Sequence, residues 1–293
     1  MANTLPYEKI TDALVAALEE GKIPWHKPWS GGVAPYNAFS KHVYKGINPI
    51  ILGLSPYNDP RWATFNQIAQ HGGNLKGQHA TAVVAWNFPE KIDPKTGLKK
   101  VVPFLKYIGV FNVEQATGLN LPALNSEKKT HTPIESAEAI VKGYSDRPRI
   151  TYGGNSAFYA PREDKIGMPQ KEDFDSPEHY YSTLFHEMAH STGHENRLNR
   201  SEVVGSIRFG NEDYSKEELV AEFCACYLSN YAGIANSDTD KNTKAYLQNW
   251  IGKLKEDVKL AVFAATRAQK ASDYILGVGK ESIESVVEED VTD

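Results

Sequence analysis

The chain has 293 residues, 41% of them hydrophobic, and a formal net charge of −5. This length allows two modest domains, and the absence of any run of eighteen apolar residues argues against a membrane-spanning helix. The first residues lack the basic region and apolar stretch of a secretory signal, so we expect a cytoplasmic protein with no membrane partner.

The small net charge conceals a division along the chain. Residues 1–130 hold 14 Lys and Arg against 9 Asp and Glu, whereas residues 131–293 hold 18 against 28. Four of the five tryptophans also lie in the basic half. Basic residues interleaved with aromatic ones are typical of surfaces that bind single-stranded nucleic acid, because bases stack on the rings and phosphates meet the cations. The two halves are therefore expected to have different partners.

The first half has the pattern of an α+β domain with a small antiparallel sheet. The predicted elements are a helix over 6–20, a short helix over 62–70, and two paired strands over 80–88 and 104–113. A proline-rich loop follows the first helix and carries Trp25 and Trp29, which are equally consistent with an exposed position and with core packing. The polar, unpatterned segment 121–130 predicts a linker.

The candidate DNA-binding residues are cations and aromatic rings of this first half. Lys41 and Lys45, on either side of Tyr44, are the strongest local combination of phosphate contact and base stacking. The whole predicted set is Trp25, Lys27, Trp29, Lys41, Tyr44, Lys45, Arg61, Trp62 and Lys76.

In the second half, a capping box with a first-turn proline predicts a helix from residue 133 to about 142. Two short strands, over 149–152 and 156–160, flank a Gly-Gly-Asn turn and predict a hairpin. A long apolar-periodic helix is predicted over 241–270, packed in the core of the second domain. The acidic segment 281–293 has little to pack and predicts a disordered tail.

The sequence HEMAH at residues 186–190 indicates the chemistry of the second half. On a helix, residues i and i+4 lie on one face, so both imidazoles can reach one metal ion. Ser176 and Pro177 predict the start of that helix, and Gly193 predicts its end. The pattern predicts a zinc peptidase site, with two histidines on a solvated helix face as the alternative.

A third metal ligand is expected from Glu218, on a second helix that opens near Ser215. Glu222, one turn later, is the predicted acceptor for the N–H of a ligand imidazole and the second candidate for the ligand itself. The alternative role for Glu218 is a capping box in which it bonds back to the amide of Ser215. His194 does not complete a three-histidine site, because that pattern places its last ligand at position 196, which is Asn196. The predicted ligands are His186, His190 and Glu218.

Glu187 is the predicted general base, which takes a proton from the attacking water and passes it to the leaving amine. The ligand set favours zinc but also accepts manganese, cobalt or nickel. In zincin architectures an edge strand above the motif helix pairs with an extended peptide, so the predicted hairpin is a candidate platform. Tyr152 or Tyr159 is a candidate for stabilising the oxyanion, with an ordinary core role as the alternative.

The chain resembles the ArdC-type plasmid antirestriction proteins, whose N-terminal domain is shared with certain conjugation primases. The resemblance covers most of the chain. It rests on WHKPW at 25–29, YKGIN at 44–48, WATF at 62–65, VFNVEQ at 110–115, IGMP at 166–169, TLFHEMAHSTGH at 183–194, RLNR at 197–200 and EELVAE at 217–222.

This resemblance implies an N-terminal domain that binds single-stranded DNA and a C-terminal zincin-like metallopeptidase domain. It also implies a role in protecting incoming plasmid DNA from host restriction during conjugation, with an unknown protein substrate such as a host restriction component. The alternative is a DNA-coating protein whose metal site is structural. The expected division is a DNA-binding domain over 1–125, a linker and connecting helix over 126–148, a peptidase domain over 149–280, and the tail over 281–293.

Overall fold

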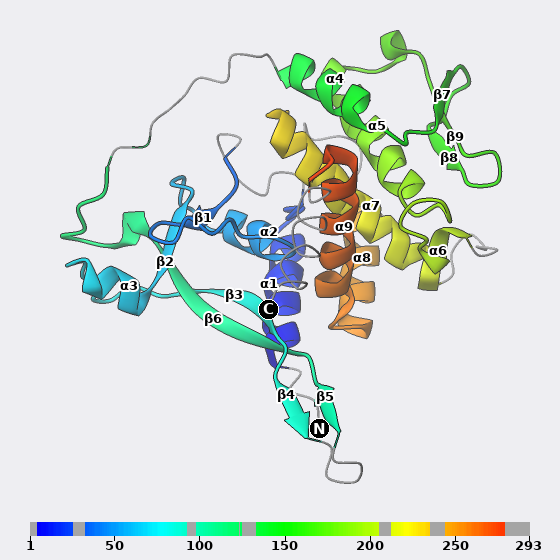
Figure 1. Ribbon diagram of the computed structural model, residues 1–293. Helices are drawn as coiled ribbons and strands as arrows, with labels where there is room; N and C mark the ends of the chain where they lie inside the picture. Colours follow the sequence, from blue (N-terminus) through cyan, green and yellow to red (C-terminus); the bar gives the residue numbers. More distant parts are fainter. Residues whose placement is uncertain are drawn as a thin grey trace, which may run out of the picture. The chain divides into compact units, whose positions relative to one another are not determined.

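The computed structural model describes residues 5–25, 33–92, 98–122, 124, 133–204, 212–234 and 244–278. The chain forms two compact units (Figure 1). The first comprises residues 1–24, 28–125 and 242–262, and the second comprises residues 25–27, 126–241 and 263–293. Within the described ranges, no helix combines the length and the apolarity needed to cross a membrane.

The first unit combines a four-stranded sheet with helices from both ends of the chain. Its elements are α1 (Leu5–Glu19), β1 (Tyr36–Asn37), α2 (Asn48–Gly53), β2 (Arg61–Thr64), α3 (Phe65–Gln70), β3 (Thr81–Asn87), β4 (Glu90–Ile92), β5 (Lys99–Val101), β6 (Phe104–Asn112), the 3-10 turn η1 (Val113–Gln115) and α8 (Lys244–Glu256). The sheet order is β1-β2-β6-β3, in which β1 is parallel to β2 and the other pairs are antiparallel. The α+β class and the predicted β3–β6 pairing are thereby confirmed.

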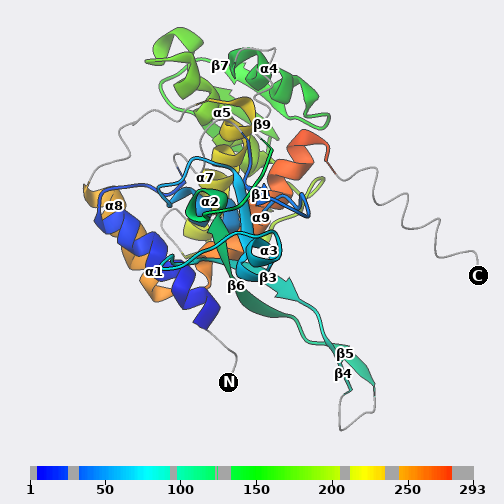
Figure 2. The ribbon, with the colours of Figure 1, turned by 90° about the vertical axis from the view of Figure 1, so that its left-hand side faces the viewer.

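The strands β3 and β6 continue outward as a two-stranded ribbon. Beyond their paired residues, the amide of Val102 donates to the carbonyl of Pro89 at 3.2 Å, and β4 then pairs with β5. The ribbon projects past the sheet and helices of its own unit (Figures 1 and 2).

The short helix predicted over 62–70 begins later than expected. Residues 61–64 form β2, in which Trp62 lies opposite Asn112 of β6. Thr64 is extended and caps α3, because its hydroxyl accepts the amide of Gln67 while the Gln67 side chain accepts the amide of Thr64. This capping box ends the strand and starts the helix at one residue.

The long helix predicted over 241–270 is two helices. The first, α8, packs on α1 of the first unit, where the hydroxyl of Thr11 donates to the carbonyl of Val258 at 2.9 Å and Lys255 pairs with Glu19 at 3.0 Å. The second, α9 (Leu260–Leu276), runs into the second unit. The expectation that this whole segment packs in the peptidase domain is therefore wrong for α8.

The second unit holds a helical core and a small mixed sheet. Its other elements are α4 (Pro133–Gly143), β7 (Arg149–Tyr152), β8 (Phe158–Ala160), β9 (Lys165–Met168), the 3-10 turn η2 (Lys171–Asp173), α5 (Pro177–Ser191), α6 (Ser201–Val204) and α7 (Glu212–Ala232). The helices α5 and α7 pack together, and α4 packs on both. The predicted connecting helix is thus part of the domain core.

The strands β7 and β8 do not form the predicted hairpin. Between them lies β9, which is parallel to β7 and antiparallel to β8. Thr151 of β7 and Phe158 of β8 both register against Gly167 of β9, where a Cβ would meet the Phe158 ring at 2.5 Å. The sequence pattern correctly indicates strands at β7 and β8, but it does not reveal their common partner.

Candidate metal centre

The helix α5 presents the HEMAH segment. Its N-terminus matches the sequence prediction, because the Ser176 hydroxyl accepts the amide of His179 at 3.1 Å and Pro177 occupies the first turn. Its end also matches the prediction, because the cap residue is Thr192 and Gly193 follows it directly. Gly193 is required there for space, since a Cβ would lie 2.4 Å from Cγ2 of Val203.

Three side chains from α5 and α7 converge. The Nε2 atoms of His186 and His190 lie 3.1 Å apart, and the Glu218 carboxylate lies 3.4 Å from His190 Nε2 and 3.6 Å from His186 Nε2. Ligand atoms at tetrahedral angles and zinc–nitrogen distances are about 3.3 Å apart. The three residues therefore fit a divalent metal ion and leave a fourth position for water or substrate.

The start of α7 argues against the alternative role of Glu218 in a capping box. It begins at Glu212, which places Ser215 inside the helix, buried, rather than at its N-cap. A capping box between Ser215 and Glu218 is therefore not formed, and the Glu218 side chain turns toward the two imidazoles.

The residue that orients His190 is Glu217. Its Oε1 lies 3.3 Å from His190 Nδ1, and Arg200 grips the same carboxylate with two N–H groups at 2.9 and 2.6 Å. Arg200 also donates to the Thr192 hydroxyl at 2.7 Å. The predicted acceptor, Glu222, is buried one turn away but does not take this role. At the other ligand, His186 Nδ1 is buried with no hydrogen-bond partner among the described residues.

These contacts favour a positive charge at the centre. Burial disfavours the imidazolium form of His190, but the Glu217 and Glu218 carboxylates outweigh it and raise the pKa of His190 to about 10. Burial likewise opposes ionisation of Glu218, yet its contacts with the two histidines hold its pKa well below the usual range. The carboxylates therefore favour a cation between the imidazoles, and a metal ion requires both histidines in the neutral form.

The predicted oxyanion residues have other contacts. The Tyr159 hydroxyl donates to Asp164 at 2.8 Å and accepts from Arg197 at 3.2 Å, while Arg197 also donates to the Ser191 carbonyl at 2.6 Å. Tyr159, the second of the two oxyanion candidates, therefore ties the β8–β9 turn to the end of α5 through Arg197. The half-exposed Tyr152 places its hydroxyl 3.2 Å from that of Tyr180, and its oxyanion role stays a prediction.

Several predicted DNA-binding residues of the first half are not available as base-stacking or phosphate-binding groups. Trp25, which belongs to the second unit, is 0% exposed and packs within that unit on Phe223 at a ring-centroid distance of 5.3 Å, and Trp62 is 2% exposed. Arg61 donates to both oxygens of Asp59, at 2.9 and 2.7 Å, and to the Pro122 carbonyl. Burial and pairing thus oppose the predictions for these three.

Lys41, Lys45 and Lys76, the remaining predicted cations that the structure describes, lie at the surface. Lys41 has φ 63° and donates to the Ala38 carbonyl at 2.8 Å, and its ammonium lies 5.7 Å from the Tyr36 ring centre. Lys45 and Lys76 are exposed, and Tyr44 is partly buried against the sheet core. Lys27 and Trp29 lie outside the described residues.

The fold and the ligand cluster define the class of the second unit. Residues 135–268 match a family described as zincin-like metallopeptidase, and residues 5–111 match the N-terminal domain of anti-restriction factor ArdC. The chain is also similar to crystal structures of the antirestriction ArdC protein from plasmid R388. The metal-free form is 34% identical with TM-score 0.73, covering 92% of this chain and 96% of that one; the Mn(II)-bound form is 32% identical with TM-score 0.74, covering 94% and 98%. The chain therefore belongs to the ArdC antirestriction family.

A second group of relatives is much longer. DNA primase TraC of Escherichia coli is 35% identical over 301 residues, which cover 95% of this chain but 28% of the primase. The chain thus spans roughly a quarter of that relative.

Proposed function

We propose that this protein binds single-stranded DNA and carries a zinc-dependent peptidase site, and that it protects incoming plasmid DNA from host restriction during conjugation. The observation that carries the proposal is the convergence of His186, His190 and Glu218 in a zincin-like domain whose chain also contains the antirestriction N-terminal domain. The proposed protein substrate is a host restriction component.

The peptidase chemistry is assigned to groups of α5 and α7. A divalent metal held by the three ligands supplies a Lewis acid that polarises a carbonyl and makes water more acidic. Glu187, next to the first ligand on α5, accepts the proton of the attacking water and returns it to the leaving amine. Glu217 accepts the Nδ1 proton of His190 and fixes the tautomer that presents Nε2 to the metal, while Arg200 holds the carboxylate in place.

The DNA-binding half of the proposal is supported by charge and by relatives. The first 130 residues carry an excess of five positive charges, 14 against 9, which favours contact with phosphates. The matched primase is by its name a DNA enzyme, and it shares nearly the whole length of this chain. We assign phosphate contacts to the exposed Lys41, Lys45 and Lys76.

The test separates the metal site from catalysis. Elemental analysis of wild type should give one zinc per chain, Glu218→Ala should lose it, and Glu187→Ala should retain it. Protection of transferred plasmid DNA in a restricting host should be abolished in both variants, while single-stranded DNA affinity should remain unchanged.

Two outcomes of that experiment count against a peptidase. Absence of metal from well-folded wild type would remove the Lewis acid on which the chemistry depends. If a folded, zinc-containing Glu187→Ala variant protects DNA as well as wild type, peptidase activity is not the cause of protection. That result would favour a DNA-coating protein whose metal has a structural role, consistent with the buried Arg200–Glu217 pair that joins the metal centre to the domain core.

A further inference from the structure

Three aromatic side chains of the first unit gather on one face of the strands β3 and β6, where these lead into the β4–β5 ribbon. Opposed residues of an antiparallel pair point to the same side, so Trp86, opposite Leu105, shares a face with Tyr107, opposite Val84. Phe88 follows two residues after Trp86, and the two rings are 6.5 Å apart with 30° between their planes. Phe88 is 62% exposed and Tyr107 43% exposed, while Trp86 is partly buried. We call these three residues the ribbon aromatics.

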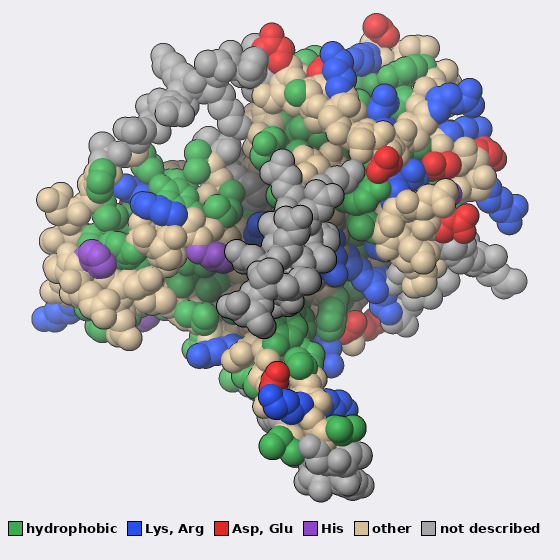
Figure 3. Space-filling model, in the orientation of Figure 1, with side chains coloured by type: hydrophobic (Ala, Val, Ile, Leu, Met, Phe, Trp, Pro, Cys, Tyr) green, Lys and Arg blue, Asp and Glu red, His purple; other side chains and the backbone are tan. Residues whose placement is uncertain are grey.

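The ribbon leaves further apolar surface exposed beyond these rings. Ile92, Leu98 and Val101 are all at least half exposed. Hydrophobic side chains lie beside lysines on the projecting ribbon in Figure 3. A folded chain has no stability to gain from large apolar groups held in water, so a contiguous set on one projecting element indicates a binding surface.

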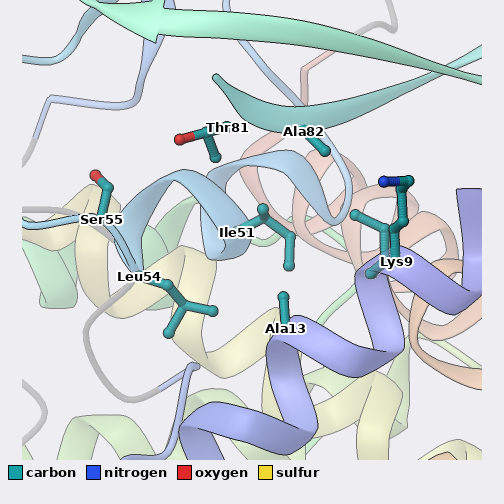
Figure 4. A pocket seen from close by; sticks show the side chains of 8 residues that line it. Lys9, Ala13, Ile51, Leu54, Ser55, Thr81 and Ala82 are labelled. Carbon is teal, nitrogen blue, oxygen red and sulfur yellow. The ribbon is translucent and has the colours of Figure 1, made fainter. Parts of the chain in front are cut away.

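The charge of the ribbon identifies the kind of partner. In its described parts, residues 86–92 and 98–106, the chain has four lysines against one acidic residue. Lys99, opposite Ile92 in the same continuous register, lies on the face of the ribbon aromatics and is exposed, with the exposed Glu90 at 2.8 Å, and Lys9 of α1 places its ammonium 5.1 Å from the ring centre of Tyr107. Lys9 also lines a pocket of about 240 Å³ between α1, α2 and β3, with Thr81 and Ala82 on the strand side (Figure 4). The exposed rings are thus bordered by cations.

This combination favours single-stranded nucleic acid over other partners. Interfaces between proteins are depleted of lysine, whereas single-strand binders place lysines beside aromatic platforms. A duplex keeps its base faces stacked inside, so exposed rings find no stacking partner there unless they wedge between base pairs.

We propose that single-stranded DNA stacks its bases on the ribbon aromatics and that Lys9 and Lys99 contact its phosphates. The inference rests on the proposed function, and it moves the stacking surface from Trp25 and Trp62, which are buried, to the ribbon.

The experiment measures the affinity of the full-length protein for a fluorescent oligothymidine and for a duplex of equal length, across a salt series. Phe88→Ala and Tyr107→Ala should each weaken oligothymidine binding by about tenfold, because one stacked base is lost. Their salt slopes should stay at the wild-type value. Lys9→Ala/Lys99→Ala should instead flatten the slope, by about 0.7 for each lysine.

Matched substitutions separate stacking from general apolar contact and from misfolding. Phe88→Tyr and Tyr107→Phe keep an aromatic face and should bind like wild type, whereas Phe88→Leu should bind as weakly as Phe88→Ala. Phe65→Ala removes an aromatic side chain of similar exposure on α3, away from the ribbon, and should change nothing. Because Phe88 is mostly exposed, its variants should keep the wild-type melting temperature.

The possible results distinguish the two levels of the proposal. No binding of oligothymidine by wild type would overturn the proposed DNA-binding function itself. Wild-type binding with unchanged affinity in Phe88→Ala and Tyr107→Ala would overturn only the ribbon assignment. Full affinity in Phe88→Leu would contradict stacking, and a duplex bound more tightly than the single strand through the same residues would contradict the choice of nucleic acid.

Discussion

Two adjacent glutamates of α7 have different tasks at the metal centre, since Glu218 faces the two Nε2 atoms and Glu217 faces Nδ1 of His190. We therefore expect Glu217→Gln to weaken zinc binding by about 10–100-fold while still binding one ion at saturation, because an orienting partner is lost and the ligands stay. Competition with a chromogenic chelator measures the zinc affinity of each variant. Glu222→Gln is the matched control, a buried glutamate of the same helix. Equal losses in both variants would contradict the assignment of Glu217.

Gly193 tests whether the space after α5 is as tight as the structure indicates. Gly193→Ala should lower the free energy of unfolding by about 1–3 kcal/mol, because its Cβ would overlap Val203 and press on Arg200. Gly143, at the end of α4 in the same unit, has no atom within 4 Å of the position that a Cβ would occupy. Gly143→Ala should therefore be neutral or stabilising by up to about 1 kcal/mol. Urea denaturation of both variants, monitored by circular dichroism, measures these changes in the free energy of unfolding.

At the scale of elements, α8 is a core helix of the first unit although it lies far along the chain. Leu254 is fully buried in α8, and this helix packs on α1. Leu254→Ala should cost about 2–5 kcal/mol through the cavity it leaves. The rate of amide hydrogen exchange should then rise in α1 and remain unchanged in α5. Gly252→Ala, on the same helix with open space around it, serves as the control. Faster exchange in α5 alone would contradict the placement of α8.

At the scale of the whole molecule, the chain passes between the two units more than once. Residues 242–262 belong with the first unit, and residues 25–27 belong with the second. A fragment of residues 1–125 should consequently expose the α1 surface that α8 covers and melt at a lower temperature than the same unit in the full-length protein. Adding a peptide of residues 242–262 should raise that melting temperature, and a scrambled peptide should not. A fragment as stable as the intact unit would show that α8 is dispensable.

Local patterns determined much of the chain. The spacing of HEMAH, the Ser176–Pro177 start and the apolar periodicity of α1 depend on residues within a few turns of one another, and the structure agrees with each. The same holds for the β3–β6 pairing, where two strands are close in sequence. The sequence also favoured Glu218, because its helix comes after the motif and carboxylates are ordinary zinc ligands, but Glu222 and the capping role stayed open until α7 was placed against α5.

Tertiary structure decided the features that depend on distant partners. Glu217 and Glu222 are equivalent in composition, and only the placement of α7 against α5 and Arg200 selects Glu217 as the support of His190. A tryptophan in a basic stretch of sequence gives no sign of whether it is packed in a core or reaches the surface, so the buried Trp25 and Trp62 cannot be distinguished from the half-buried Trp86 until the fold is known. Spacing along the chain thus determined which groups share one helix face. The packing of distant segments then decided which side chains are buried or paired, and therefore which of them can reach a ligand.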